Sequence, residues 1–463
     1  MKLSKKFAVG LAATALVGSL GISAASAATI VAGGATFPLN LMESCRATFA
    51  GDSTANAAGD KIDYTGVGSG TGRSNFFKGD YKFAMSDSVY KSSDTSYRTS
   101  FVFMPLIAGA INVAYRLDGV KPAGTVLQMS SATVAKIFAG QIKTWNDASI
   151  KADNPVAAQP KLLGLNGQTK FTLAKTKKAT QALLTATLTS KAVTKSTKNL
   201  IITSSVDGGK TVKKIYNKKP VAGKLSLTVP YAVGTVYSIT LDKALIGTLS
   251  VDATSVVLPD TAITVYKRKD TSGTTNNFAN YLNKAQPTIW TKATNDAFDT
   301  AFPGTVPTDG SFVAAQGNDG VANGVMGKDG GIGYAEVSFV NERQTAGKPI
   351  VSAKIQNGAG EFLAGSSAGA SLAVGAAEVN STTGIVTFNY ANTVAGAYPI
   401  TAVSYGMANT AAYGTAADNT IAKNYVNYVL DTCAPTVAEI KGYAQLPASL
   451  VAISKTIAAK IGA

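Results

Sequence analysis

Apolar and polar residues follow two patterns near both ends of the chain, one typical of short strands and one of amphipathic helices. Strand-like runs cover 62–67, 101–115, 262–266, 331–334 and 400–405, and helix-like spacing covers 41–49, 130–138, 276–284 and 450–461. Strands that alternate with helices are typical of α/β layers around a central sheet. The pattern therefore predicts an α/β fold, with the last helix packed on its core.

The middle of the chain has a different pattern, in which strand-length runs are separated by turn residues. The runs cover 183–189, 200–204, 224–229, 237–241 and 245–251, with turn-like pieces at 207–209 and 222–223. Several short strands at this spacing are typical of a small β-sandwich, such as an immunoglobulin-like one. We therefore expect an inserted β-sandwich over 158–258.

This middle segment also carries most of the charge. The chain has a formal net charge of +16, and residues 151–260 contain 16 Lys, five Asp, no Arg and no Glu. One interpretation is a basic patch that binds an anionic surface polymer. The other is a solvated lysine surface that keeps strand edges from pairing with other chains. Nucleic-acid binding is not favoured, because the segment lacks Arg and has few aromatic residues to stack on bases.

The first 27 residues resemble an export signal. Lys2, Lys5 and Lys6 precede a short apolar run at 7–20, and Ala-Ser-Ala at 25–27 supplies the small residues of a cleavage site. We predict a signal peptide over 1–27 and an exported chain that starts at Ala28. No transmembrane segment is predicted in that mature chain, because the apolar run at 101–115 is interrupted by Pro105 and Asn112.

Composition excludes several kinds of chemistry. The chain has no histidine, which excludes His-dependent catalysis and His-ligated zinc. Two cysteines are too few for a thiolate metal site, and we predict no metal, no cofactor and no catalytic residue. In an oxidising compartment Cys45 and Cys433 either form a disulfide or remain as buried thiols, and we favour the disulfide.

Two motif matches are set aside. Gly-Ser-Ser-Ala-Gly at 365–369 fits the serine-hydrolase elbow, but no histidine is present to activate Ser367. Gly-Lys-Thr at 209–211 resembles the end of a phosphate-binding P-loop, but Ser204 occupies the position of its first glycine. Neither match predicts an activity.

Three clusters of glycine and hydroxyl residues precede helical patterns, at 33–38, 68–72 and 268–274. Each would present backbone N–H groups, hydroxyl donors and the positive end of a helix dipole. Arg268 adds a guanidinium suited to a tetrahedral oxyanion. If the fold brings the clusters together, they form an anion site; the alternative for each cluster alone is an ordinary helix cap.

These clusters and several other motifs resemble the phosphate-binding proteins of bacterial phosphate ABC transporters, which are type II periplasmic binding proteins. The resemblance covers about 29–150 and 260–454. The motifs are Gly-Ala-Thr-Phe-Pro at 34–38, Tyr-Thr-Gly-Val-Gly-Ser at 64–69, Phe-Ala-Met-Ser-Asp at 83–87, Ile-Phe-Ala-Gly-Gln-Ile-Lys-Thr-Trp-Asn-Asp at 137–147, Arg-Lys-Asp-Thr-Ser-Gly-Thr at 268–274, Gly-Asn-Asp-Gly-Val-Ala at 317–322, Gly-Ile-Gly-Tyr at 331–334 and Tyr-Pro-Ile-Thr at 398–401. The residues after Ser69 and the inserted segment depart from the family pattern.

The resemblance implies two α/β lobes and a set of phosphate ligands. Lobe I would comprise 28–112 and 400–463, and lobe II would comprise 113–157 and 259–399, with the insert between them. The implied ligands are Thr36, Phe37 (through its backbone N–H), Ser69, Asp87, Arg268, Ser272, Gly273 (through its backbone N–H) and Thr274.

The function implied is capture of inorganic phosphate between the lobes and its delivery to an ABC transporter permease, in the periplasm and without catalysis. Asp87 fits an anion site only if the ligand carries a proton, because the P–OH of monohydrogen phosphate can donate to a carboxylate and sulfate cannot. The alternative is a secreted or cell-surface interaction protein that keeps the phosphate site and binds an anionic partner through the insert.

Overall fold

The computed structural model describes the chain with a few gaps. The described residues are 27–91, 94, 100–121, 123–155, 159–165, 169–176, 181–188, 196–206, 211–221, 223–232, 234–241, 243–252 and 256–463. The predicted signal peptide, apart from residue 27, and the predicted turn at 207–209 lie outside the described residues.

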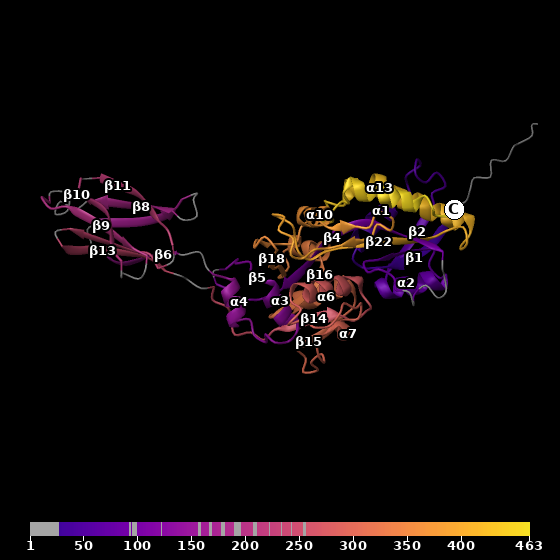
Figure 1. The fold of residues 1–463 in the computed structure, drawn as a ribbon, viewed down its shortest axis with the longest axis horizontal. Helices are drawn as coiled ribbons and strands as arrows, with labels where there is room; N and C mark the ends of the chain where they lie inside the picture. Colours follow the sequence, from indigo (N-terminus) through magenta and orange to yellow (C-terminus); the bar gives the residue numbers. More distant parts are fainter. Residues whose placement is uncertain are drawn as a thin grey trace, which may run out of the picture.

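A nine-stranded mixed sheet forms the centre of the larger part of the molecule (Figure 1). Its order is β15-β14-β16-β4-β22-β3-β1-β2, with β17 also pairing with β4. The strands are β1 Thr29–Gly34, β2 Lys61–Gly66, β3 Phe83–Ser86, β4 Phe101–Tyr115, β14 Thr264–Arg268, β15 Phe312–Ala315, β16 Gly331–Glu336, β17 Val351–Ser352 and β22 Thr401–Asn409. This arrangement confirms the predicted α/β class.

Strand β4 joins the two halves of this sheet. Its residues 101–110 pair with β22, and its residues 111–115 pair with β16. We call β1, β2, β3 and β22 the first half of the sheet, and β14, β15, β16 and β17 the second half. Parallel pairing of β1 with β2 and β3, and of β14 with β15 and β16, leaves the carboxyl ends of these strands as places for ligands.

Helices and short strands complete this part of the molecule. The helices are α1 Leu39–Phe49, α2 Ser69–Lys78, α3 Ser131–Phe138, α4 Ala148–Asp153, α6 Gly273–Ala285, α7 Phe298–Ala301, α8 Gly317–Gly327, α9 Val337–Thr345, α10 Ser367–Gly375, α11 Ala416–Tyr428, α12 Ala434–Val437 and α13 Ala448–Ala458, with a π-helical turn η2 at Val429–Cys433. The short strands are β5 Gln128–Met129, β18 Lys354–Gln356, β19 Phe362–Leu363, β20 Glu378–Val379 and β21 Val386–Thr387. Helix α13 buries Leu450 and Ile457 and packs against β4, as its spacing predicts. Among the described residues, no helix is long and apolar enough to span a bilayer.

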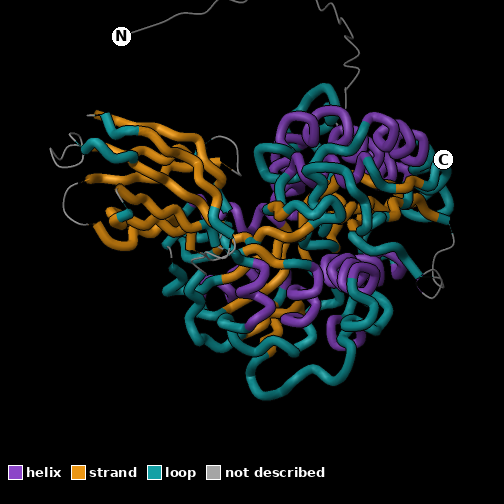
Figure 2. The backbone as a smooth tube through the Cα atoms, turned by 60° about the vertical axis from the view of Figure 1, so that its left-hand side comes forward, coloured by secondary structure: helices purple, strands orange, loops and turns teal. Residues whose placement is uncertain are grey.

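Residues 159–252 form two further sheets, which Figures 1 and 2 show to one side of the α/β part. One sheet has the order β10-β9-β12-β13-β6 and the other β11-β8-β7. Their strands are β6 Gln159–Leu165, β7 Thr169–Lys175, β8 Gln181–Leu188, β9 Leu200–Ser205, β10 Lys213–Lys218, β11 Gly223–Pro230, β12 Val236–Leu241 and β13 Ala244–Asp252. The five predicted strands are present, and β6, β7 and β10 were not predicted.

This β segment has a hydrophobic core of its own, which includes Leu184, Ile202 and Tyr237. Its first and last strands are antiparallel neighbours, with Gln159 opposite Asp252, so the segment leaves and rejoins the α/β part at one place. Val256 and Leu258, which the prediction assigned to the insert, pack in the core of the α/β part. The immunoglobulin-like topology stays a prediction.

A disulfide joins Cys45 of α1 to Cys433 of η2, with a Cα–Cα distance of 5.6 Å. The two residues are 388 positions apart in the sequence. Both are buried in the main hydrophobic core. The bridge therefore ties the N-terminal helix to the C-terminal part of the chain, which is the pairing that the sequence analysis favoured.

Candidate functional site

Residues from both halves of the sheet meet at the carboxyl ends of β1, β2, β3 and β14. Thr36 follows β1, and Arg268 is the last residue of β14. Arg268 Nη2 donates to Thr36 Oγ1 at 3.1 Å, and the side-chain amide of Asn318 at the start of α8 donates to the same oxygen at 3.0 Å. Thr36 and Arg268 are both buried, so this contact crosses from one half of the sheet to the other inside the protein.

Asp270 orients the Arg268 guanidinium. Arg268 Nε donates to Asp270 Oδ1 at 2.9 Å, and its Nη2 pairs with Asp270 Oδ2. Burial alone would raise the pKa of Asp270. The positive charge and hydrogen bonds of Arg268 act in the opposite direction, as does a hydrogen bond from the backbone N–H of Gly317. Together they lower the pKa of Asp270. The third guanidinium nitrogen, Arg268 Nη1, is buried and has no hydrogen-bond partner among the described residues. A buried donor of this kind is costly unless a ligand accepts its hydrogen bond.

Asp87 lies directly after β3 and has one firmly bound oxygen and one loosely bound oxygen. Ser404 Oγ on β22 donates to Asp87 Oδ1 at 2.8 Å. Asp87 Oδ2 is 3.5 Å from Ser69 Oγ and 3.4 Å from Thr274 Oγ1, which is the outer limit of a hydrogen bond. Oδ2 therefore has capacity to accept a stronger hydrogen bond from a ligand.

Burial determines the charge state of Asp87. Desolvation raises its pKa to about 7, although the Ser404 hydrogen bond and the positive charge of Arg268 act in the opposite direction. Asp296 adds a further raising effect. Burial therefore favours the protonated acid, whereas a ligand that donates a hydrogen bond to Oδ2 would favour the ionised carboxylate.

Two helix N-termini face each other beside Asp87. Ser69 is the first residue of α2, and its Oγ accepts from the backbone N–H of Asp87 at 3.1 Å. Ser272 caps α6, with its Oγ accepting from Thr275 N at 3.2 Å, so that Gly273 and Thr274 form the first turn. First-turn N–H groups have no partner within their own helix. In α2 the N–H of Gly70 already donates to the Thr271 carbonyl at 3.0 Å, so the first turn of α6, at Gly273 and Thr274, is the better candidate to bind an anion.

Gly273 allows this close approach. A Cβ atom at this position would lie 2.5 Å from Ser69 Oγ, 2.7 Å from Asp87 Cβ and 2.8 Å from Ser88 N. These distances are far below normal contact, so the absence of a side chain lets α6 pack against the Ser69–Asp87 pair. The glycine and hydroxyl clusters are expected ahead of their helices, but residues of two clusters form the first turn itself, at Ser69 of α2 and at Gly273 of α6.

Phe37 lies one residue before the N-cap of α1, and a second buried carboxyl group supports its loop. The Tyr443 hydroxyl donates to the Phe37 carbonyl at 2.8 Å and lies 3.2 Å from Ser338 Oγ. Ser338 in turn donates to Glu336 Oε2 through its backbone N–H at 3.0 Å and through its hydroxyl. Glu336 is fully buried, and desolvation raises its pKa to about 8.

The structure brings all eight predicted ligand residues to this region, and it adds others that the sequence analysis did not name as ligands. The added residues are Asp270, Asn318 and Ser404. Asp270 and Asn318 lie inside motifs that the resemblance had already identified, whereas Ser404 lies on a buried strand with no local signal. What the arrangement offers is one guanidinium, several hydroxyl and backbone N–H donors, and one carboxylate. Such a set suits a small tetrahedral anion that carries a proton.

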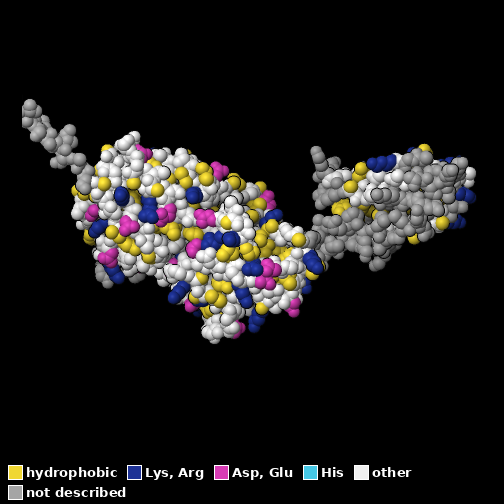
Figure 3. All heavy atoms as spheres, turned by 180° about the vertical axis from the view of Figure 1, so that it is seen from behind, with side chains coloured by type: hydrophobic (Ala, Val, Ile, Leu, Met, Phe, Trp, Pro, Cys, Tyr) yellow, Lys and Arg dark blue, Asp and Glu magenta, His cyan; other side chains and the backbone are white. Residues whose placement is uncertain are grey.

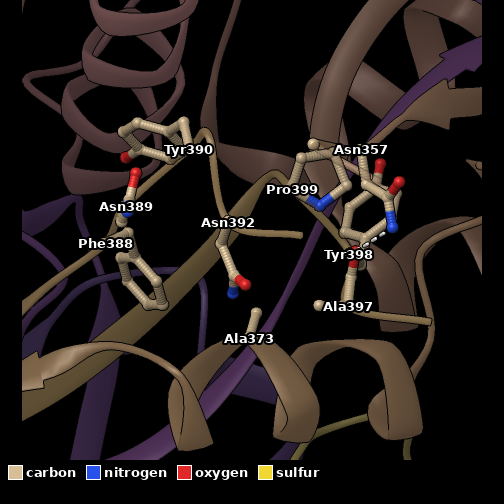
Figure 4. A pocket seen from close by; sticks show the side chains of 10 residues that line it. Asn357, Ala373, Phe388, Asn389, Tyr390, Asn392, Ala397, Tyr398 and Pro399 are labelled. Atoms are coloured by element: carbon tan, nitrogen blue, oxygen red, sulfur yellow. Dashed lines mark hydrogen bonds between the residues drawn. The ribbon is translucent and has the colours of Figure 1, made fainter. Parts of the chain in front are cut away.

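Other features of the described residues lie apart from this site. Among the described residues, no group of three or more Cys, Asp or Glu side chains could hold a metal ion. Figure 4 shows a separate hollow near α10, where Asn357, Tyr390 and Tyr398 are among the lining residues. Its lining contains none of the eight predicted ligand residues. Figure 3 shows positive and negative side chains mixed over one face of the α/β part.

A mixed sheet in two halves, with helix N-termini that converge from both halves on one region, is the architecture of a substrate-binding protein. The chain belongs to the PBP superfamily: the family model described as "PBP superfamily domain" matches residues 22–236 and 236–432. The predicted type II periplasmic binding fold is thus confirmed.

Similar proteins fit this assignment. The Phosphate-binding protein PstS of Xylella fastidiosa (strain Temecula1) is 24% identical over 352 residues, which are 75% of this chain but only 64% of that protein. The PstS of Haemophilus influenzae is 30% identical over 29% of this chain and 38% of that protein. The chain thus spans less than two thirds of these curated relatives.

Solved structures agree on the fold. A high-affinity periplasmic phosphate-binding protein (PfluDING), solved with bound phosphate, has a TM-score of 0.55 at 18% identity and covers 94% of this chain and 99% of its own. A phosphate-binding protein from Stenotrophomonas maltophilia has a TM-score of 0.53 at 16% identity, with coverage of 92% and 93%.

Proposed function

We propose that this protein captures inorganic phosphate between the two halves of its sheet. The observation that carries the proposal is the buried Arg268 Nη1, which has no hydrogen-bond partner among the described residues and lies on a guanidinium already oriented by Asp270. The names of the similar proteins support phosphate as the anion. The proposed ligand residues are Thr36, Phe37, Ser69, Asp87, Arg268, Ser272, Gly273 and Thr274.

The proposed role of Asp87 is to accept a hydrogen bond from the P–OH of monohydrogen phosphate. Among the described residues, Asp87 Oδ2 has two hydrogen-bond partners, both at the outer limit of hydrogen bonding, so it can accept from a P–OH group. The remaining phosphate oxygens would accept from Arg268, from the hydroxyl groups and from the first-turn N–H groups of α6. Sulfate would bring an oxygen lone pair to Asp87 and no proton. A site of this type rejects an analogue that lacks the donor by about 10⁴–10⁵.

We further propose that the two halves close around phosphate and that the closed protein delivers it to an ABC transporter permease after export. Support comes from the cross-half contacts of Thr36 with Arg268 and of Asp87 with Thr274. Adding loaded protein to permease-containing vesicles should start phosphate uptake, whereas loaded protein that leaves uptake at background would contradict delivery.

Sequencing the exported protein from its N-terminus tests cleavage before Ala28.

Calorimetric titration tests the ligand. Protein freed of bound anion by unfolding and refolding is titrated with phosphate and, in parallel, with sulfate at pH 8. We expect one-to-one binding of phosphate and no heat from sulfate. Refolded protein with a normal unfolding transition but no phosphate heat would overturn the assignment.

The inserted β segment supports a second candidate role, binding of an anionic surface polymer. Lys213, Lys214 and Lys218 lie along the edge strand β10, and these three lysines are exposed. Figure 3 shows basic side chains at the rim of this segment. Salt-dependent binding to dextran sulfate, lost when the three lysines are replaced by serine, would support this role. Equal binding by the variant would contradict it.

A further inference from the structure

A second charged pair crosses between the two halves of the sheet, apart from the proposed phosphate ligands. Arg73 on α2 belongs to the first half, and Asp296 lies between α6 and α7 in the second half. Arg73 Nη2 and Asp296 Oδ2 are 2.7 Å apart, and the two side chains are only 5% and 6% exposed. An ion pair this deeply buried requires that both partners be present, because each alone would be an uncompensated charge.

The surrounding contacts hold both side chains in place. Arg73 Nη1 donates to Ser86 Oγ at 3.0 Å and to Ser88 Oγ at 2.6 Å, and these serines flank Asp87. Ser88 Oγ also donates to Asp296 Oδ2 at 3.1 Å. The pair is therefore hydrogen-bonded to both chain neighbours of Asp87, the carboxylate that is proposed to accept a hydrogen bond from phosphate.

Asp296 is also attached to the N-terminus of α6. Its carbonyl oxygen accepts from Ser272 N at 2.9 Å, and its Oδ1 accepts from Asn276 Nδ2 at 2.8 Å. Movement of Asp296 therefore moves the capping residue and the first turn of α6. The Arg73–Asp296 contact thus fixes the position of this turn against Ser69 and Asp87.

We propose that Arg73 and Asp296 form a latch that stabilises the closed state, and that they act as positioning residues and not as phosphate ligands. The inference rests on the proposed function. When the halves separate, water can hydrate both charges, so the open state loses the contact without leaving a buried charge. The contact between Arg73 and Asp296 exists only when the halves are together. Loss of this contact should therefore speed phosphate release more than it slows phosphate capture.

Arg73 has a second ionic partner that serves as a matched control. Arg73 Nε donates to Asp94 Oδ2 at 3.1 Å, and Asp94 lies between β3 and β4, in the first half of the sheet. Neutralising Asp94 removes one negative charge from the same guanidinium without breaking a contact between the halves. Asp296→Asn and Asp94→Asn each remove one formal negative charge beside Arg73, although Asp94 is the more exposed of the two, and only Asp296→Asn breaks a contact between the halves.

The test measures phosphate association and dissociation rates with radiolabelled phosphate in both variants. We expect Asp296→Asn to raise the dissociation rate about 10- to 100-fold and to leave the association rate within about two-fold, because a charge-assisted contact is lost only in the closed state. Asp94→Asn should change dissociation less than about three-fold. Both variants should still show a cooperative thermal unfolding transition, which confirms that each is folded. Equal dissociation rates in the two variants would overturn the latch.

A ligand-independent measurement separates the latch from the phosphate assignment. Small-angle scattering of anion-free protein should show a larger radius of gyration for Asp296→Asn than for Asp94→Asn. If wild-type protein binds no phosphate but this difference is present, only the proposed ligand fails. If phosphate binds tightly while neither the radius nor the release rate differs, only the latch fails.

Discussion

At the scale of single residues, two buried carboxyl groups make the stability of the folded structure, with its two halves together, sensitive to pH. Burial raises the pKa of Asp87 to about 7 and that of Glu336 to about 8. In the unfolded chain both groups ionise near pH 4, so folding takes up protons between pH 4 and 8. The free energy of unfolding should therefore fall as the pH rises through this window, and the loss is complete above pH 8.

Replacing Glu336 by glutamine tests this linkage. The amide keeps an acceptor for Ser338 but cannot ionise, so the variant should be more stable than the wild type at pH 9, by on the order of 2 kcal/mol, and similar to it at pH 4. Urea unfolding across this pH range measures the difference. Glu378→Gln, at an exposed position, is the control and should show no such divergence. Parallel curves for the Glu336 variant and the wild type would contradict the assignment.

Asp87→Asn tests the selectivity of the site. An amide can donate a hydrogen bond as well as accept one, so the variant no longer requires a ligand proton. Phosphate affinity should fall about 100-fold, and the preference over sulfate should largely disappear. Competition calorimetry at pH 8 measures both. Unchanged rejection of sulfate would show that Asp87 is not the residue that discriminates.

The residues of the candidate site were predictable to an unequal extent. The eight proposed ligands lie in short motifs that resemble those of phosphate-binding proteins, so the resemblance could imply them from the sequence. Ser404 could not be found this way, because it is a serine on a buried strand and contacts Asp87 only through sheet pairing across 317 positions. The Arg73–Asp296 pair joins residues 223 positions apart and likewise depends on the fold.

At the scale of helices and strands, two glycines predict opposite effects. A Cβ at Gly273 would strike Ser69 and Asp87 across the two halves of the sheet, whereas a Cβ at Gly72 would lie 2.3 Å from Gly34 Cα within the first half. Gly273→Ala should therefore weaken phosphate binding about 10- to 100-fold without lowering the stability of the ligand-free protein. Gly72→Ala should lower that stability. Calorimetry and thermal unfolding together distinguish the two, and a destabilised Gly273 variant would contradict the expectation.

Strands were predictable where one face or both faces are buried. The alternation at 237–241 and the continuous apolar run at 101–115 gave β12 and β4. Strand β10 was missed because its sequence, Lys-Lys-Ile-Tyr-Asn-Lys, has only two adjacent partly buried residues and four exposed ones. Edge position, which is a property of the sheet and not of the strand, explains this composition.

At the scale of the whole molecule, the β segment should be removable. It has a separate hydrophobic core, and its ends pair with each other at Gln159 and Asp252. Replacing 159–252 by a short glycine-serine linker should leave phosphate affinity within about two-fold, because the strands described in this segment pack against one another and not against the elements that carry the proposed ligands. The deletion must leave Val256 and Leu258 in place, because they pack in the hydrophobic core of the α/β part. A variant that folds but loses phosphate binding would show that the segment supports the site.

Strand β4 also bears on the time course of folding. It pairs with β22 over residues 101–110, but β22 begins only at Thr401, so the strand that joins both halves has no partner on that side until most of the chain has been made. Pairing over such a sequence separation is slow, because the intervening chain must first be brought together. The α/β part therefore cannot complete its sheet until late in synthesis. An incompletely folded polypeptide is the state that can be threaded through a secretion channel.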